Sequence, residues 1–304
     1  MSIRFQNILC ALVSGMDQAE TTRQAELRAE HDGSRLTFLP VVRSLEGIPF
    51  PEAREQVVLQ ELHRNSLGSH DLPKSLRGIM SFEHYSRFFH QGSGHSVETI
   101  AAEANRTRCD LLVLPYRPRK WLYGKTVDYD PEGIVRKVTC PVLVVHPGSH
   151  QKKVLAATDF ADSSLPEIHT AVEESQRMGC ELLLMHSLDV TRPHTPDMLT
   201  GALFPGGLLS AKELGRLRQN AEQRLQGALH RFGAAGAVRV AFTPPGVAIV
   251  ESARREDAEL VVIGTVGRTG LSRLLLGSVA EYVLRYSPCS VLVVRLNGSQ
   301  SREN

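Results

Sequence analysis

Three glycines and a Gly-Ser pair near the carboxyl end of the chain have the types and spacing that suit a phosphate chain. The segment Leu260–Arg295 reads LVVIGTVGRTGLSRLLLGSVAEYVLRYSPCSVLVVR, with glycines at 264, 267 and 270 and then Gly277-Ser278. Glycine lets the backbone turn with positive φ and approach a ligand without a Cβ clash. Free N–H groups at a helix start, aligned with the helix dipole, favour an anion. The segment therefore predicts a phosphate-binding loop followed by a helix N-terminus.

Charged and polar side chains near these glycines each have two interpretations. Arg268 and Arg273 lie inside the glycine loop, where they either contact phosphate oxygens or stay on a solvated face. Asp159 ends the apolar run of KVLAATDF and either binds a ligand or caps a turn. Ser278 opens Ser-Val-Ala-Glu, so its hydroxyl either serves a capping box or faces phosphate. His186 ends a buried strand and is expected to be a bonded core histidine rather than a ligand.

The elements that position these residues occur twice in the chain. Leu111–Val145 aligns over Leu260–Val294 without a gap, and both segments begin with an apolar strand and end in VLVV. A repeat of about 150 residues has the size of a domain and indicates a tandem duplication. We expect a first domain at residues 1–147, a second at 151–297, a short polar linker between them and a flexible tail at 298–304.

Apolar runs alternate with helical segments in each half, which is typical of a parallel sheet covered on both faces. The predicted strands of the first half are Ile8–Val13, Leu36–Val41, roughly Tyr85–His90, Leu111–Leu114 and Val142–Val145. Those of the second half are Val154–Thr158, Leu182–Met185, Val238–Phe242, Glu259–Ile263 and Val291–Val294. Capping boxes at Ser164–Glu167 and Ser210–Glu213 predict helix starts. The fold class is α/β: two tandem doubly wound, five-stranded, Rossmann-like domains of strand order 3-2-1-4-5. Such sheets bind ligands where the strand order reverses, here beside Asp159 and Gly264.

The spacing Gly-x2-Gly-x9-Gly-Ser resembles the nucleotide-binding signature of the universal stress protein family, and the resemblance extends over almost the whole chain as two tandem copies. It implies one ATP per chain, with Mg²⁺, bound by the second half. The residues that the resemblance assigns to the nucleotide are Ala157, Thr158, Asp159, Ser187, Ile263, Gly264, Gly267, Arg268, Gly277, Ser278 and Val279.

The resemblance also implies roles for these residues. Asp159 would contact the ribose or the metal-linked phosphate, and the backbone of 157–158 would contact the adenine or ribose. Ser187 would lie near the adenine edge. The glycines would line the phosphate path, and the residues 277–279 would donate to the phosphates.

The first half is expected to have lost this site. The residues aligned under Asp159, Gly264, Gly267 and Gly277-Ser278 are Val13, Pro115, Pro118 and Asp128-Tyr129. Proline removes a donor and fixes φ, and carboxylates repel phosphate. The basic loop Arg117–Lys125 nearby contains the only tryptophan. It either contacts an anionic ligand, a lipid headgroup or single-stranded nucleic acid, or is a solvated loop whose Trp121 plugs the vacated pocket.

Composition bears on the protein's partners, on metal binding and on its location. A formal net charge of +2 gives no bulk reason to bind nucleic acid or membrane. The five cysteines have no metal-ligand or disulfide spacing, and no metal site or membrane span is expected. We therefore expect a cytoplasmic protein. The strand-five edges predict an intrachain pseudo-dimer, and two chains could pair as a homodimer.

Three functions are weighed. The first is an ATP-binding stress-response regulator that acts through its conformation or its unknown protein partners. The second is a slow ATPase or nucleotidyl-transfer enzyme, which the absence of a Walker A lysine and of an evident catalytic base disfavours. The third is a scaffold without nucleotide. The intact glycine spacing and Asp159 favour the first, with no catalytic residue assigned.

Overall fold

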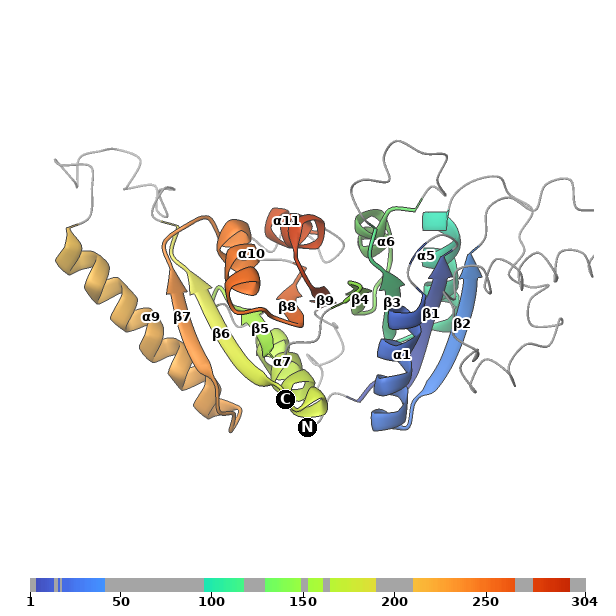
Figure 1. Ribbon diagram of the computed structural model, residues 1–304, viewed down its shortest axis with the longest axis horizontal. Coiled ribbons are helices and arrows are strands. Elements are labelled where there is room, and N and C mark those ends of the chain that lie inside the picture. The colour runs from blue at the N-terminus through green and yellow to red at the C-terminus, as the bar shows by residue number, and fades with distance from the viewer. Residues whose placement is uncertain are drawn as a thin grey trace, which may run out of the picture. The chain divides into compact units, whose positions relative to one another are not determined.

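The computed structural model describes residues 4–13, 16, 18–41, 96–117, 129–148, 153–160, 165–189, 210–265 and 276–295. The described residues divide into two compact units, one within Arg4–Gly148 and one within Ser149–Asn304. These units are called the first and second halves below, and each is described by itself (Figure 1).

The first half has four described strands, all parallel. Its elements in chain order are β1 (Asn7–Val13), α1 (Ala19–Asp32), β2 (Arg35–Val41), α5 (Ser96–Thr107), β3 (Leu111–Pro115), α6 (Pro131–Lys137) and β4 (Val142–Val145). The strands lie in the order β2-β1-β3-β4. Helix α1 packs against all four strands, and α5 packs against β2 and against α6. These four strands were predicted to within one residue at each end; the strand predicted near 85–90 lies outside the described residues.

The second half has five parallel strands. Its elements are β5 (Lys153–Ala157), α7 (Leu165–Met178), β6 (Glu181–Ser187), α9 (Ala211–Arg231), β7 (Ala237–Ala241), α10 (Pro245–Arg255), β8 (Leu260–Gly264), α11 (Ser278–Tyr286) and β9 (Ser290–Val294). The strands lie in the order β9-β8-β5-β6-β7. Numbered 1 to 5 within this half and read from β7 to β9, that order is 3-2-1-4-5, which confirms the predicted topology. The terminal strands β4 and β9 are those predicted to pair, and their pairing stays a prediction.

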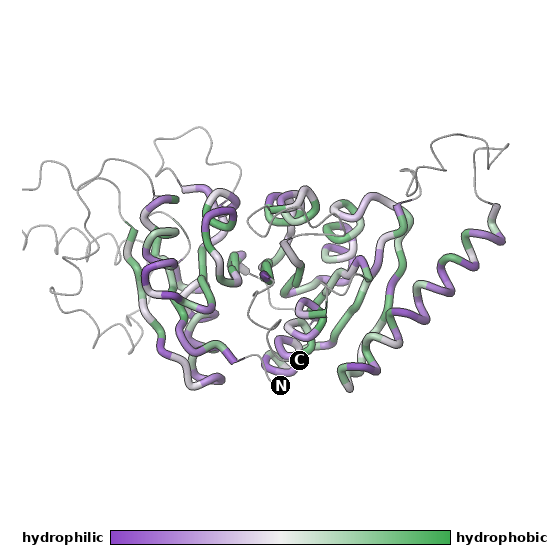
Figure 2. The backbone as a smooth tube through the Cα atoms, turned by 180° about the vertical axis from the view of Figure 1, so that it is seen from behind, coloured by the Kyte–Doolittle hydropathy of each residue, from purple (hydrophilic) through white to green (hydrophobic). Residues whose placement is uncertain are grey.

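Helices cover both faces of the second-half sheet. Helix α7 packs against β5, β6, β8 and β9, and α9 packs against β6 and β7. Helices α10 and α11 pack against each other on the opposite side of the strands (Figure 1). Strands covered on both faces must be apolar throughout, and Leu260–Ile263 and Val291–Leu292 are almost fully buried. The strands accordingly form the apolar centre of each half (Figure 2).

Helix α9 departs from this pattern because much of it is polar. The capping box predicted at its start is confirmed: the Glu213 N–H donates to Ser210 Oγ (3.3 Å), and the Ser210 N–H donates to Glu213 Oε2 (2.7 Å). Its buried residues are Ala221, Leu225 and Leu229, spaced four apart along the second part of the helix. The first turns are exposed and hydrophilic (Figure 2).

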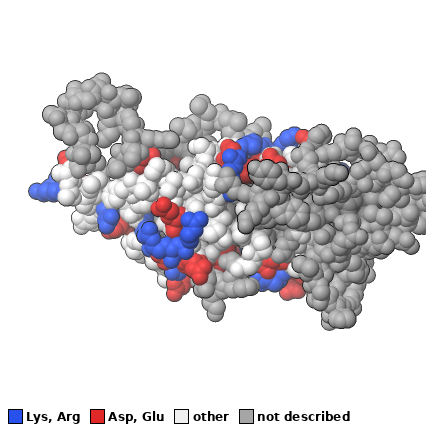
Figure 3. Space-filling view, turned by 45° about the horizontal axis from the view of Figure 1, so that its top comes forward, with Lys and Arg blue, Asp and Glu red and all other residues white. Residues whose placement is uncertain are grey.

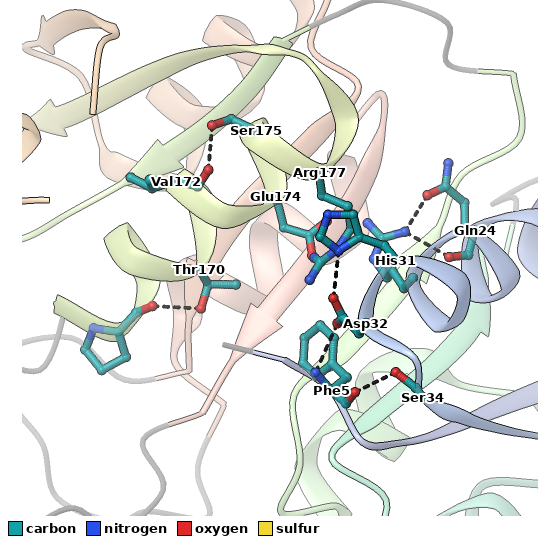
Figure 4. A network of polar contacts seen from close by, with 12 residues as sticks. Phe5, Gln24, His31, Asp32, Ser34, Thr170, Val172, Glu174, Ser175 and Arg177 are labelled. Atoms are coloured by element: carbon teal, nitrogen blue, oxygen red, sulfur yellow. Dashed lines mark hydrogen bonds and ion pairs between the residues drawn. The ribbon is translucent and has the colours of Figure 1, made fainter. Parts of the chain in front are cut away.

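Polar contacts fix the turn between α1 and β2 in the first half. The Phe5 N–H donates to Asp32 Oδ2 (3.0 Å), and the Ser34 hydroxyl donates to the Phe5 carbonyl (2.5 Å; Figure 4). Gly33 ends α1 with φ of 69°, the left-handed conformation that glycine adopts without strain. These contacts set where β2 begins beside β1.

The cysteines are free thiols, and four of the five are buried. The Sγ atoms of Cys109 and Cys140 lie 3.6 Å apart at the starts of neighbouring strands. The hydrogen bond between the two thiols, together with burial, raises the pKa of Cys109, so the Cys109 thiol is held in the neutral form.

Charges of both signs are interspersed on the described surface (Figure 3). Glu256, for example, pairs with Lys153 (2.8 Å) and with Arg239. Such an arrangement matches the small net charge and gives no one-signed face in this view. Among the helices of the described residues, none combines the length and apolar character needed to cross a bilayer.

Candidate functional site

The backbone segments that follow the neighbouring strands β5 and β8 diverge at the carboxyl ends of these strands in the second half. These strands pair from Val154–Leu260 to Ala156–Val262. Beyond β5, the Thr158 N–H donates to Met185 of β6 (3.0 Å), whereas beyond β8 the Thr265 N–H donates to Val294 of β9 (3.2 Å). The backbone segments that follow β5 and β8 therefore turn towards opposite neighbours. Such a divergence is the switch point where doubly wound sheets bind ligands.

Residues 158–160 form a tight turn after β5. The Phe160 N–H donates to Thr158 Oγ1 (3.0 Å), and Phe160 has φ of 62°, which is unusual for a residue with a side chain. Its ring lies against His186 (centroids 4.2 Å apart) and under the Arg224 guanidinium (4.0 Å). Asp159, held at the apex of this turn, is half-buried. The turn thus fixes the predicted ligand-binding carboxylate at the switch point.

His186 is a bonded, buried histidine, as predicted. It is 9% exposed, and its Nδ1 lies 2.7 Å from the Thr158 carbonyl oxygen. Ser187, the next residue, is half-buried, and its hydroxyl donates to the Thr243 carbonyl. The Thr158 N–H and carbonyl are both bonded within the chain, so the adenine or ribose contacts predicted for its backbone would need to share these groups.

Helix α11 begins beside the end of β8. Gly277 is its N-cap, and the Gly277 N–H donates to the Thr265 carbonyl (2.7 Å). A helix N-terminus leaves its first N–H groups without an intrahelical acceptor, here those of Ser278 and Val279. The helix begins at Ser278, as predicted, but the capping box considered as one role for the Ser278 hydroxyl is wrong, because the N-cap is Gly277 and makes no side-chain bond. Ser278, exposed at the first helical position, is available to a ligand.

Glu167 is the residue of this site that sequence reasoning missed. It lies in the first turn of α7, and only 8% of it is exposed. A Cβ on residue 264 would lie 1.7 Å from Glu167 Oε1, so the carboxyl occupies the space that the glycine leaves. Thr170, one turn along, donates its hydroxyl back to the Pro166 carbonyl (2.7 Å; Figure 4). Glu167 was interpreted only as a capping-box partner of Ser164, which lies outside the described residues.

The environment of Glu167 favours its neutral form. Burial raises the pKa of this carboxyl to about 8, the Asp159 charge raises it too, and the Gly264 N–H opposes the rise. A position in the first turn of a helix ordinarily favours a carboxylate. Desolvation outweighs that effect here, so most Glu167 side chains are protonated at neutral pH.

The structure brings together nine of the residues that were predicted to hold the nucleotide. They are Ala157, Thr158, Asp159, Ser187, Ile263, Gly264, Gly277, Ser278 and Val279, at the ends of β5, β6 and β8 and the start of α11. Gly267, Arg268 and Arg273 lie outside the described residues. Within the described ranges, no group of three or more His, Cys, Asp or Glu side chains is placed to hold a metal ion.

Gly264→Ala tests the contact with Glu167. We expect the substitution to lower the free energy of unfolding by about 1–3 kcal/mol, because the new Cβ must displace a buried carboxyl. In the Glu167→Ala background the same substitution should cost less than about 0.5 kcal/mol. Urea unfolding of wild type, the two single variants and the double variant measures the coupling between positions 264 and 167.

The control for this cycle is Gly227→Ala, at a helical glycine where a Cβ would meet nothing within 4 Å. It should stabilise the protein by up to about 1 kcal/mol. Equal losses for Gly264→Ala in both backgrounds would show that the carboxyl does not constrain position 264.

The corresponding place in the first half is filled by Tyr129. This side chain, aligned with Ser278, is fully buried, and its hydroxyl donates to the Pro115 carbonyl (2.6 Å) at the end of β3. Arg117 donates to the Tyr129 carbonyl from the other side of the loop. Trp121, predicted as a possible plug, lies outside the described residues. An aromatic ring therefore stands in the first half where the second half has an exposed serine.

Both halves of the chain match one family model, described as the Universal stress protein family, over residues 4–146 and 151–295. A universal stress protein of Methanocaldococcus jannaschii is 34% identical over 146 residues, 47% of this chain and 82% of that protein. The universal stress protein E homolog of Haemophilus influenzae is 29% identical over 211 residues, 67% of each chain. A Mycobacterium tuberculosis universal stress protein is 30% identical, and the match covers 57% of each chain.

Two solved structures share the fold along the chain. A putative universal stress protein of Pseudomonas aeruginosa superposes with a TM-score of 0.58 at 21% identity, covering 95% of this chain and 93% of that one. A universal stress protein of Archaeoglobus fulgidus superposes with a TM-score of 0.56 at 17% identity, covering 96% of this chain and 96% of that one. At these identities the likeness establishes the fold alone.

Proposed function

Because the chain belongs to the universal stress protein family, as two tandem copies, we propose that its second half binds one ATP. The bound nucleotide would regulate the protein's partners through conformation, and the first half would bind none. The observation that carries this proposal is the divergence of the backbone after β5 and β8 beside the start of α11. It combines a switch point with free N–H groups at a helix N-terminus.

The residues at this place suit the parts of an adenine nucleotide. Asp159 would accept hydrogen bonds from the ribose hydroxyls, and the end of β6 at Ser187 would lie beside the base. The N–H groups of Ser278 and Val279 and the Ser278 hydroxyl would donate to phosphate oxygens. Gly277 would contribute by starting the helix, since its own N–H is bonded to Thr265.

The predicted loop glycine Gly267 and cation Arg268 would complete the phosphate path. Bound ATP would present anionic phosphates, and the chain would bind them with N–H donors and positively charged side chains. A regulator requires retention of the nucleotide rather than rapid turnover.

The enzyme alternative gains one specific candidate from the structure. Glu167 is a buried carboxyl whose pKa is raised to about 8, a combination that often marks a general acid or base. Its carboxyl lies against Gly264, the last residue of β8. Turnover of labelled ATP that vanishes in Glu167→Gln would favour the enzyme.

The proposal is tested by measuring the nucleotide that purified protein carries. The full chain, denatured and chromatographed, should release about one adenine nucleotide per chain. Asp159→Ala should release little, because the ribose loses its carboxylate partner, and a charge-assisted hydrogen bond contributes about 1.5–3 kcal/mol. Unchanged release from a folded Asp159→Ala variant would contradict the site assignment.

A further inference from the structure

The Glu167 carboxyl lies at the place where the proposed nucleotide site meets the sheet. It reaches from the first turn of α7 to Gly264, the last residue of β8. The carboxyl fills the space beside Gly264 so closely that Oε1 lies 1.7 Å, and Oε2 3.2 Å, from where a Cβ would stand. Gly264 is also the first glycine of the predicted phosphate loop. One carboxyl thus touches the backbone that would have to approach the phosphates.

The surroundings leave the charge of Glu167 with little compensation from the elements packed against α7. Neither β8 nor β9 carries an ionisable side chain. The ionisable groups on or next to the other strands are Lys153 in β5, Asp159 after β5, Glu181 and His186 in β6, and Arg295 after β9. Those on α7 itself are His169, Glu173, Glu174 and Arg177. Lys153 and Glu181 stand at the amino ends of their strands, away from Gly264. Arg177 pairs with Glu174, and His186 is bonded to the Thr158 carbonyl.

The Asp159 carboxylate is the charge that acts on Glu167 at this end of the sheet, and it has the same sign. Two negative charges at one partly dehydrated place repel each other and repel an incoming polyphosphate. A neutral Glu167 removes one of them and leaves a hydrogen-bonding group of the same shape.

We propose, on the basis of the nucleotide site proposed above, that Glu167 determines the charge of the ligand that this site accepts. In its neutral form it admits a nucleoside triphosphate, and in its ionised form it opposes the phosphates while leaving an uncharged nucleoside unaffected. Binding of ATP is therefore coupled to the uptake of a proton by Glu167 at alkaline pH. The second-half site then holds ATP most tightly near neutral pH and below, and releases it as the pH rises.

The experiment is a calorimetric titration of nucleotide-free full chain with ATP and, separately, with adenosine at pH 7 and pH 9. If only the neutral form accepts ATP, wild-type affinity should fall about tenfold over this interval, since the carboxyl changes from mostly protonated to mostly ionised. In Glu167→Gln the ATP affinity should change less than about twofold. Adenosine affinity should be nearly the same at both pH values in both proteins.

A second readout identifies the proton directly. Titration with ATP at pH 8.5 in two buffers of different ionisation enthalpy measures the protons taken up on binding. Wild-type protein should take up a substantial fraction of one proton more than Glu167→Gln. Glu167→Ala provides the same comparison should the glutamine variant fold poorly, and Glu251→Gln, at an exposed position on α10, should behave as wild type.

The outcomes separate the two proposals. ATP binding with the same pH profile and proton uptake in wild type and Glu167→Gln would overturn the role of Glu167 and leave the nucleotide site intact. Failure of every folded variant to bind ATP at either pH would overturn the proposed function and this inference together. An equal alkaline loss for adenosine and ATP would overturn the assignment to ligand charge.

Discussion

Replacement of Glu167 by glutamine should make the nucleotide-free protein markedly more stable than wild type at alkaline pH. Burial raises the pKa of this carboxyl from its ordinary 4.5 to about 8. Between these values the folded state holds a proton that the unfolded state has released. The contribution of the protonated Glu167 side chain to the free energy of unfolding is therefore fully present below pH 4.5, and it is lost as the pH rises towards 8. The loss amounts to about 1.4 kcal/mol per pH unit.

The measurement is urea unfolding of both proteins at intervals from pH 5 to pH 9, followed by circular dichroism. The difference between Glu167→Gln and wild type should grow by up to roughly 4 kcal/mol between pH 5 and pH 8 and then level off. Other titrating groups cancel because they are common to both proteins. The control Glu251→Gln should track wild type, and a constant difference across the range would show that Glu167 is ionised in the folded protein.

Replacement of Tyr129 by alanine should destabilise the first half by about 3–5 kcal/mol, the loss typical of a large buried aromatic side chain. Tyr129 is fully buried and its hydroxyl is bonded to the Pro115 carbonyl. Tyr129→Phe keeps the ring and removes only that bond, leaving a buried carbonyl, so a loss of about 1–3 kcal/mol is expected.

Urea unfolding of the full chain measures both effects. Leu217→Ala is the control, because this apolar side chain is 38% exposed on α9 and should change stability by less than about 0.5 kcal/mol. A loss for Tyr129→Ala no larger than that for Leu217→Ala would mean that the ring does not fill the first-half site.

The sheet could be predicted from the sequence because its strands are continuous apolar runs. Val291–Val294 and Leu260–Ile263 are buried on both faces, so their composition alone indicates central parallel strands. The start of α9 was predictable for a local reason: Ser210 and Glu213 satisfy each other within four residues. Topology followed from the order of these elements and from the preference for right-handed crossovers.

The site was predictable in position but not in its bonding. The start of α11 at Ser278 was predicted correctly, but its cap was not: the Ser278–Glu281 pattern is local, whereas the bond from the Gly277 N–H to the Thr265 carbonyl depends on the fold. Glu167 was overlooked because an acidic residue in a first helical turn already has an ordinary explanation as a cap. Nothing in the sequence says that its side chain turns inward to Gly264. The same holds for Tyr129, whose burial becomes evident only when β3 and the start of α6 are placed together.

The central claim is that the chain has one nucleotide site, in its second half. The most direct test is a titration of nucleotide-free full chain with ATP at neutral pH that measures the stoichiometry. Wild type and Asp130→Ala, a change beside Tyr129 in the first half, should each bind about one ATP per chain, and Asp159→Ala should bind none within the same concentration range. Two ATP per chain, or one ATP per chain retained by Asp159→Ala and lost by Asp130→Ala, would contradict the account.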